Sequence, residues 1–143
     1  LGQIKCENSI DSLNVIILSN QNNQIRLAAI ISAGLIGNQS SVNYLKEALD
    51  DEEANLRWDA AISLSKIGDS SGYNIIKKLL DRGYYSNYPE VDNIEINNSI
   101  LTVLALISEN DKKIFNKELE FLAKNEKNIK IREFAMKILS EYY

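Results

Sequence analysis

Histidine and cysteine, two residue types that often carry enzyme chemistry, are absent or nearly absent from this chain. Histidine is absent, which excludes histidine-based acid–base catalysis and imidazole ligation of a metal within these residues. Cys6 is the single cysteine, and we interpret its thiol as buried or incidental because no histidine is present to activate it. No glycine-rich phosphate loop, cysteine–histidine cluster or nucleophile elbow occurs. We therefore predict no catalytic residue, no metal site and no cofactor, and we expect a protein that is not an enzyme.

A tyrosine-rich segment is the strongest local anomaly in the sequence. Residues 82–93 hold the only proline of the chain and three of its seven tyrosines, namely Tyr84, Tyr85 and Tyr88. Tyrosine offers a large, rigid contact area with a hydrogen-bonding tip, which suits recognition of a partner. The alternative is that these tyrosines fold back over the neighbouring helices and cover core. Both interpretations stay open at this point.

Charged residues are unevenly distributed along the chain. Residues 47–53 concentrate five acids at one predicted turn, which either forms a solvated turn or attracts a basic partner in a salt-dependent manner. Their spacing matches no calcium loop. Lysines between residues 112 and 130 alternate with glutamates, so we interpret that end as a mixed-charge surface. The net charge of −4 argues against nucleic-acid binding through a broad basic face.

An internal repeat determines where these side chains lie. Two segments, 25–38 and 56–69, share an apolar pattern, and their arginines Arg26 and Arg57 lie 31 positions apart. A glycine follows the last apolar residue of each segment at the same step, where helices commonly end in a left-handed residue. Apolar residues at helical spacing predict one buried stripe on each second helix. Each unit is therefore expected to fold as two helices.

We predict a single repeat domain, residues 1–143, with four helix pairs. The pairs are expected at residues 7–37, 40–68, 70–108 and 111–142, and residues 1–4 are interpreted as the end of a preceding second helix. The first residue is leucine rather than methionine, so a removed leader or a longer parent protein stays open. End units of a helical array normally carry polar caps, and the N-terminal end has none. We expect upstream residues or a contact with another copy to cover it.

The repeat resembles the HEAT family, specifically the short bacterial HEAT-like repeats first noted in phycobilisome lyases. The residues that carry the resemblance are Asp50-Asp51, Leu56-Arg57, Ala60-Ala61, Leu64 and Ile67-Gly68. It implies an all-α fold, a right-handed α–α superhelix of the armadillo and HEAT type. The resemblance covers nearly the whole chain and is specific for the fold, but it says almost nothing about function.

In such repeats, a turn aspartate and the repeat arginine typically form a ladder between adjacent units. The acids that match are Asp50 and Asp51, and the arginines that match are Arg26, Arg57 and Arg132. Asn97 replaces the arginine in the third unit, and no acid stands in the turn before Arg26. The resemblance therefore implies an incomplete ladder.

The resemblance also implies that the second helices line a concave face. Side chains off the apolar stripe of the second unit would then point outward, where we predict a binding surface: Trp58, Asp59, Ile62, Ser63 and Lys66. Neighbouring units would add Leu27, Ala28 and Ile31 on one side, and Asn98, Ser99 and Thr102 on the other. A lone tryptophan more often packs in a core or at an edge than anchors a partner, so packing is the alternative role for Trp58.

We predict an interaction scaffold or adaptor, because an exposed face on a helical array suffices for that function. The partner is expected to be a protein, bound through the concave face, the 83–92 loop or both. The alternative is an accessory factor, lyase-like or chaperone-like, for a cofactor-bearing protein. A relative of the HEAT-like DNA-repair glycosylases is a weaker candidate because the chain is acidic and short. One cysteine and no long apolar run indicate a reducing compartment and no membrane span, so we expect a cytoplasmic location.

Overall fold

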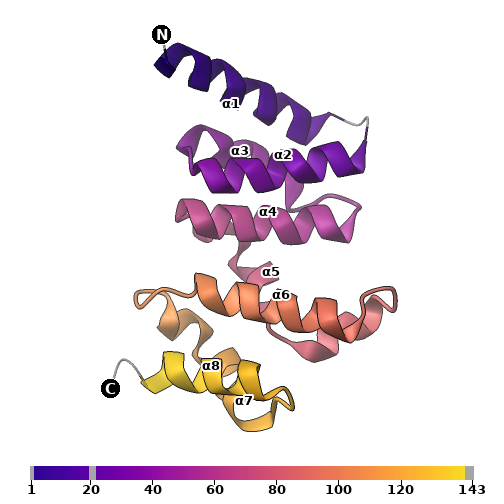
Figure 1. Cartoon of the computed structure of the whole chain (residues 1–143), viewed down its shortest axis with the longest axis vertical. Coiled ribbons are helices and arrows are strands. Elements are labelled where there is room, and N and C mark those ends of the chain that lie inside the picture. Colours follow the sequence, from indigo (N-terminus) through magenta and orange to yellow (C-terminus); the bar gives the residue numbers. More distant parts are fainter. Residues whose placement is uncertain (1, 20–21, 141–143) are drawn as a thin grey trace. The chain divides into compact units, whose positions relative to one another are not determined.

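Helices account for the regular structure of the residues that the structure describes (Figure 1). The computed structural model describes residues 2–19 and 22–140, with side chains from residue 9 onward, and no strand occurs within these ranges. The helices are α1 (Gly2–Leu18), α2 (Asn23–Ile36), α3 (Val42–Ala48), α4 (Ala54–Ile67), α5 (Tyr73–Leu79), α6 (Asn93–Leu106), α7 (Asn116–Asn125) and α8 (Ile129–Ser140). Four short 3-10 helices lie between them: η1 (Gln39–Ser41), η2 (Ser70–Gly72), η3 (Arg82–Asn87) and η4 (Lys112–Phe115). The all-α prediction is confirmed.

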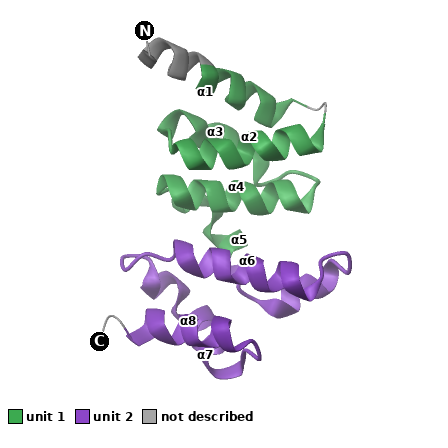
Figure 2. Cartoon of the chain, viewed as in Figure 1, with its two compact units in different colours: residues 1–76 green, residues 77–143 purple. Residues whose placement is uncertain are grey.

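The chain divides into two compact units, residues 1–76 and residues 77–143 (Figure 2). We call them unit 1 and unit 2. The boundary falls within α5 and therefore inside the predicted third helix pair, 70–108. The expectation of one domain over residues 1–143 did not include such a division. Each unit is described by itself below.

The start of the first helix differs from the sequence-based prediction. α1 is one helix from Gly2 to Leu18, so residues 2–4 belong to the first helix pair and do not end a preceding helix. Leu1, and residues 141 and 142 at the end of the predicted fourth pair, lie outside the described residues. Residues 2–18 form one continuous helix because no proline or glycine stands between residues 3 and 18. Nothing in the sequence therefore interrupts the backbone hydrogen bonds of α1.

The core of unit 1 lies where α1, α2, α3 and α4 pack together. Side chains from all four helices are fully or almost fully buried there: Ile17, Ile30, Leu45, Leu56 and Leu64. Both α2 and α4 end at a glycine in the left-handed conformation, with φ of 72° at Gly37 and 90° at Gly68. A side chain with a Cβ is strained at such angles. The repeated glycines thus end the second helices at equivalent points, as the sequence predicts.

A close approach between α2 and α4 overturns the expected position of Ser63. A Cβ built on Gly34 would lie 2.5 Å from the Ser63 Oγ, so the two helices meet closely because residue 34 has no side chain. The Ser63 hydroxyl donates to the Ile30 carbonyl oxygen at 2.9 Å, and the residue is only 2% exposed. Ser63 therefore fastens α4 to α2 and does not point outward. The helical spacing of apolar residues in α4 could not show that the neighbouring α2 carries a glycine, Gly34, opposite Ser63.

The core of unit 2 is formed by α6, α7 and α8 together with η3. Its fully buried side chains include Ile100, Leu119, Ile131 and Ala135. The tyrosine-rich segment ends in a capping box, in which the Asp92 side chain accepts from the Glu95 N–H and the Glu95 side chain accepts from the Asp92 N–H. This reciprocal cap satisfies free backbone donors at the start of α6 and fixes where the inserted segment joins it.

Candidate functional site

A largely buried arginine–aspartate pair holds two successive helix pairs of unit 1 together. Arg26 on α2 donates from Nε to the Ile17 carbonyl oxygen at 3.0 Å, and from Nη2 to the Asp51 carboxylate in the turn before α4. Asp51 also accepts from the Glu53 N–H at 3.0 Å. Arg57 donates to the backbone carbonyl oxygen of Asp51 at 2.7 Å. This is the ladder contact that the resemblance implies, and Asp51 rather than Asp50 makes the ion pair with Arg26.

The environment of Asp51 favours its charged form. Burial raises the pKa of Asp51, but the hydrogen bond from the Glu53 N–H and the ion pair with Arg26 outweigh that effect, so the pKa lies below its ordinary value. The neighbouring Asp50 is exposed and lines an acidic pocket in the turn. Within the described residues, no three acid, cysteine or histidine side chains converge in a way that could hold a metal ion.

A second arginine–carboxylate contact of the same kind occurs in unit 2. Arg82 donates to both carboxylate oxygens of Glu126, at 3.2 and 3.0 Å, and to the Asn97 side-chain oxygen at 2.6 Å. Glu126 accepts from the Asn128 N–H, and Arg132 donates to the Glu126 backbone carbonyl oxygen. Burial raises the pKa of Glu126, yet the bidentate contact with Arg82 and the backbone donors bring it below its ordinary value.

These two contacts repeat one geometry. Asp51 lies six positions before Arg57, and Glu126 lies six positions before Arg132, so both turn acids stand in the same relation to their own second helix. The expected gap in the ladder at Asn97 is filled by Arg82, which comes from the inserted segment and binds both Asn97 and Glu126. Sequence reasoning did not identify Arg82 or Glu126. The six-residue spacing from acid to arginine was the available signal.

The tyrosines of the inserted segment divide into a buried one and a half-buried pair. Tyr85 is 3% exposed, donates its hydroxyl to the Leu79 carbonyl oxygen at 2.9 Å and lies 2.8 Å from the Ser99 hydroxyl. Burial raises the pKa of Tyr85 to about 12. The hydroxyls of Tyr84 and Tyr88 are 3.1 Å apart, and their rings meet edge to face. The packing interpretation therefore describes Tyr85, which offers no surface to a partner.

The predicted binding residues of α4 lie beside an uncharged part of α2. Lys66 is exposed, whereas Trp58, Asp59 and Ile62 are half-buried. Burial raises the pKa of Asp59, and the positive charge of Lys66 only partly opposes this. The matching positions on α2, 31 residues earlier, hold Leu27, Ala28, Ile31 and Leu35. We call the side chains of these eight residues the α2–α4 face.

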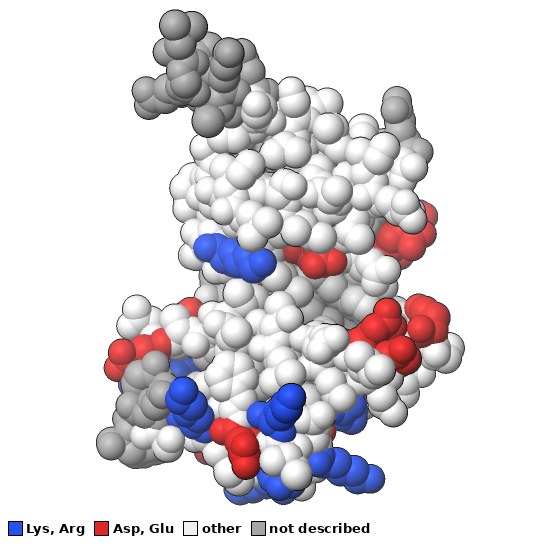
Figure 3. Space-filling model, viewed as in Figure 1, with Lys and Arg blue, Asp and Glu red and all other residues white. Residues whose placement is uncertain are grey.

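The α2 half of this face is apolar and carries no charge. Ala28, Ile31 and Leu35 are exposed, and Leu35 reaches 71% exposure. The only charged residue in α2 is Arg26, which is buried. In Figure 3 the surface over α2 is accordingly white on the side in view, while charged side chains appear over α4 and the turns. Asn98, Ser99 and Thr102, the remaining predicted surface residues, lie on α6 in unit 2, where Ser99 meets Tyr85.

Helix pairs that repeat along the chain, end in left-handed glycines and are joined by arginine–carboxylate contacts define a helical repeat protein. A family model described as HEAT repeats matches residues 10–87. Because this match covers more than half of the 143 residues, the chain belongs to the HEAT repeat family. No curated protein was found to match the chain. No helix in the described ranges is both long and apolar enough to cross a membrane.

Proposed function

We propose that the protein binds a protein partner through the α2–α4 face of unit 1. The observation that carries this proposal is the row of exposed apolar side chains on α2, Ala28, Ile31 and Leu35, without a charged residue among them. Contiguous exposed apolar side chains on a soluble protein commonly mark an interaction site. HEAT repeats generally mediate protein–protein interaction, which supports the same interpretation.

The α4 half of the face supplies polar groups beside the apolar row. Asp59 and Lys66 offer one negative and one positive charge, and Trp58 and Ile62 keep part of their apolar surface exposed. A partner segment with an apolar centre and a charged flank would match this arrangement, because interfaces usually combine an apolar core with a polar rim. An accessory role toward a cofactor-bearing protein would use the same face and differ only in the identity of the partner.

The test is a comparison of partners captured by wild-type protein and by Leu35→Glu in the native cell extract. A buried charge in the apolar row should weaken binding about tenfold or more. Ile94→Glu is the matched control, because Ile94 is 70% exposed and lies on α6 in unit 2. A partner that is lost with Leu35→Glu and retained with Ile94→Glu supports the proposal. Equal capture by all three proteins would overturn it.

A further inference from the structure

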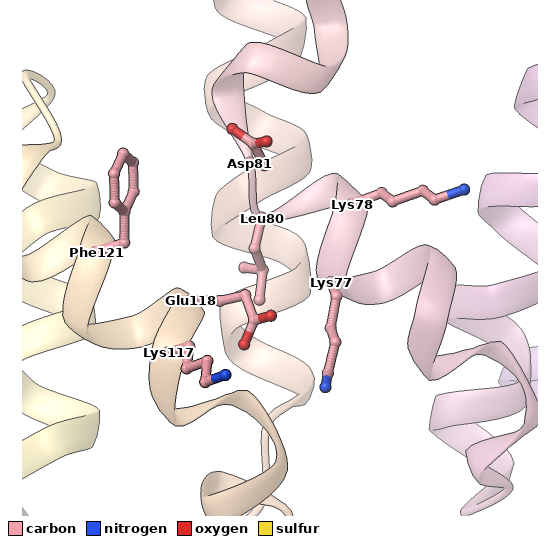
Figure 4. Close-up of a pocket in the computed structure, with 7 residues that line it drawn as sticks. All are labelled: Lys77, Lys78, Leu80, Asp81, Lys117, Glu118 and Phe121. Atoms are coloured by element: carbon pink, nitrogen blue, oxygen red, sulfur yellow. The ribbon is translucent and has the colours of Figure 1, made fainter.

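Unit 2 contains a pocket of about 380 Å³ between the region around the end of α5 and helix α7 (Figure 4). This volume lies within the range of about 300–1,000 Å³ typical of ligand pockets. Its lining includes Lys77, Lys78 and Lys117 together with the acids Asp81 and Glu118, and in Figure 4 the ammonium groups of Lys77 and Lys117 lie on either side of the Glu118 carboxylate. The lining residues thus carry three positive charges against two negative ones, in a chain whose net charge is −4.

One carboxylate oxygen in this pocket lacks a partner. The Oε2 atom of Glu118 is buried and has no hydrogen-bond partner among the described residues. Figure 4 shows its carboxylate on the same side of the pocket as the ammonium groups of Lys77 and Lys117. A buried acceptor without a donor is costly, so a ligand that brings an N–H or O–H group to Glu118 would remove that cost. An anion alone would not do so.

The remaining wall of the pocket is apolar. Leu80 and Phe121 both line it; Leu80 is almost completely buried, whereas Phe121 is 59% exposed. An aromatic ring that is left this exposed can gain contact area from an apolar ligand group. The pocket therefore combines three features: positive charges for an anionic group, an unpaired acceptor for an N–H donor, and an apolar wall.

We propose that this pocket binds an acidic peptide segment that carries an apolar side chain next to its carboxylates. The ammonium groups of Lys77 and Lys117 attract the acids of the peptide. Its backbone N–H donates to Glu118, and its apolar side chain packs on the exposed ring of Phe121. A free inorganic anion supplies only the first of these three contacts. The charge complementarity and the unpaired acceptor together favour the peptide.

The experiment measures fluorescence anisotropy of a labelled peptide of sequence ELDFEL with the full chain. We expect binding that weakens as salt is raised, because exposed charges are screened. The peptide KLKFKL, with reversed charge, and the peptide ESDSES, without apolar residues, should bind more weakly. Lys117→Glu should weaken binding of ELDFEL about fivefold to tenfold, from the loss of one attraction and the gain of one repulsion. Lys130→Glu, an exposed lysine outside the pocket lining, is the control.

Two further variants separate a peptide site from a simple anion site. Glu118→Gln should weaken binding of ELDFEL, because the amide oxygen is a poorer acceptor for the peptide N–H than a carboxylate. If the site binds only an anion, the same substitution removes a repulsion and strengthens binding. Phe121→Ser should also weaken binding, with Ile129→Ser as its control because Ile129 has the same 59% exposure.

The outcomes against the proposal are equally specific. Stronger binding with Glu118→Gln, no effect of Phe121→Ser, or displacement of ELDFEL by inorganic phosphate at equal potency would each indicate an anion site and overturn the peptide proposal. Thermal unfolding of every variant shows whether it is folded. Chemical-shift changes confined to the pocket residues on addition of ELDFEL would support the proposal in the wild-type protein without any substitution.

This site is independent of the α2–α4 face, because its residues all belong to unit 2. Leu35→Glu should therefore leave binding of ELDFEL unchanged, and Lys117→Glu should leave capture of the unit 1 partner unchanged. A failure of either proposal can be recognised without affecting the other.

Discussion

At the scale of single residues, Arg26 and Arg82 form equivalent contacts from different places in the chain. Arg26 lies within α2, whereas Arg82 lies in the segment before α6 and donates to both Asn97 and Glu126. In each case a guanidinium group joins a turn carboxylate that backbone N–H groups also hold. If the arginine is removed, such a carboxylate loses its charge partner while it stays largely shielded from water.

Replacement of Arg26 by methionine should destabilise unit 1 markedly. The side chains of Arg26 and Asp51 are only 10% and 13% exposed, so the variant leaves a largely buried carboxylate without its cation. We expect a loss of about 2–3 kcal/mol in the free energy of unfolding, below the value for a fully buried pair because some solvent remains. Urea denaturation measures it. Lys46→Met, which removes a more exposed pair with Asp69, should cost less than about 1 kcal/mol; equal losses would contradict this account.

The same carboxylates make the stability of the protein depend on pH. Asp51 and Glu126 have pKa values below their ordinary values of 3.8 and 4.5 in the folded state. The unfolded chain therefore binds protons first as the pH falls, and the stability gained above those ordinary values is lost as the pH falls through the folded values. We expect the urea midpoint to fall steeply below about pH 4.5. The difference between wild type and Asp51→Asn should shrink over that range; a constant difference would refute the role of Asp51.

At the scale of elements, the sequence predicts the regular parts well because their signals are local. The glycines at 37 and 68 follow apolar stripes directly, and both end their helices as expected. The burial of Ser63 was missed because it depends on Gly34 of a neighbouring helix. The contact of Arg82 with Glu126 joins residues 44 positions apart and falls outside the repeat register. Contacts that depend on a partner helix or on an insertion leave no periodic signal in one sequence.

Within η3, the two kinds of tyrosine should respond differently to loss of the hydroxyl. Tyr85→Phe leaves the Leu79 carbonyl and the Ser99 hydroxyl without their buried partner, and we expect it to cost about 1–2 kcal/mol. Tyr84→Phe is the matched control, because Tyr84 and its hydroxyl partner Tyr88 are both half-buried and keep access to water, and should cost about 0.5 kcal/mol. Thermal unfolding compares them. A larger effect of Tyr84→Phe would show that the packing of the segment depends on the outer pair instead.

At the scale of the whole molecule, the division into units 1 and 2 bears on whether parts of the chain unfold separately. Repeat proteins are stabilised mainly by contacts within and between neighbouring repeats, so parts of the array can open separately. Each unit here has its own set of fully buried side chains, such as Leu64 in unit 1 and Leu119 in unit 2. A cavity introduced into one core should therefore first raise the hydrogen-exchange rates of the amides in its own unit.

Hydrogen exchange of Leu64→Ala and Leu119→Ala tests this directly. Both side chains are fully buried, and each truncation should cost about 2–5 kcal/mol through lost burial and the cavity left behind. For Leu64→Ala we expect faster exchange in α2 and α4, with smaller changes in α7 and α8. For Leu119→Ala we expect the reverse pattern. The two variants are each other's control, because the chemistry is the same and only the unit differs. Equal acceleration of hydrogen exchange in both units for either variant would mean that the chain unfolds as one cooperative body. The separate tests of the two binding sites would then need to account for stability lost across the whole chain.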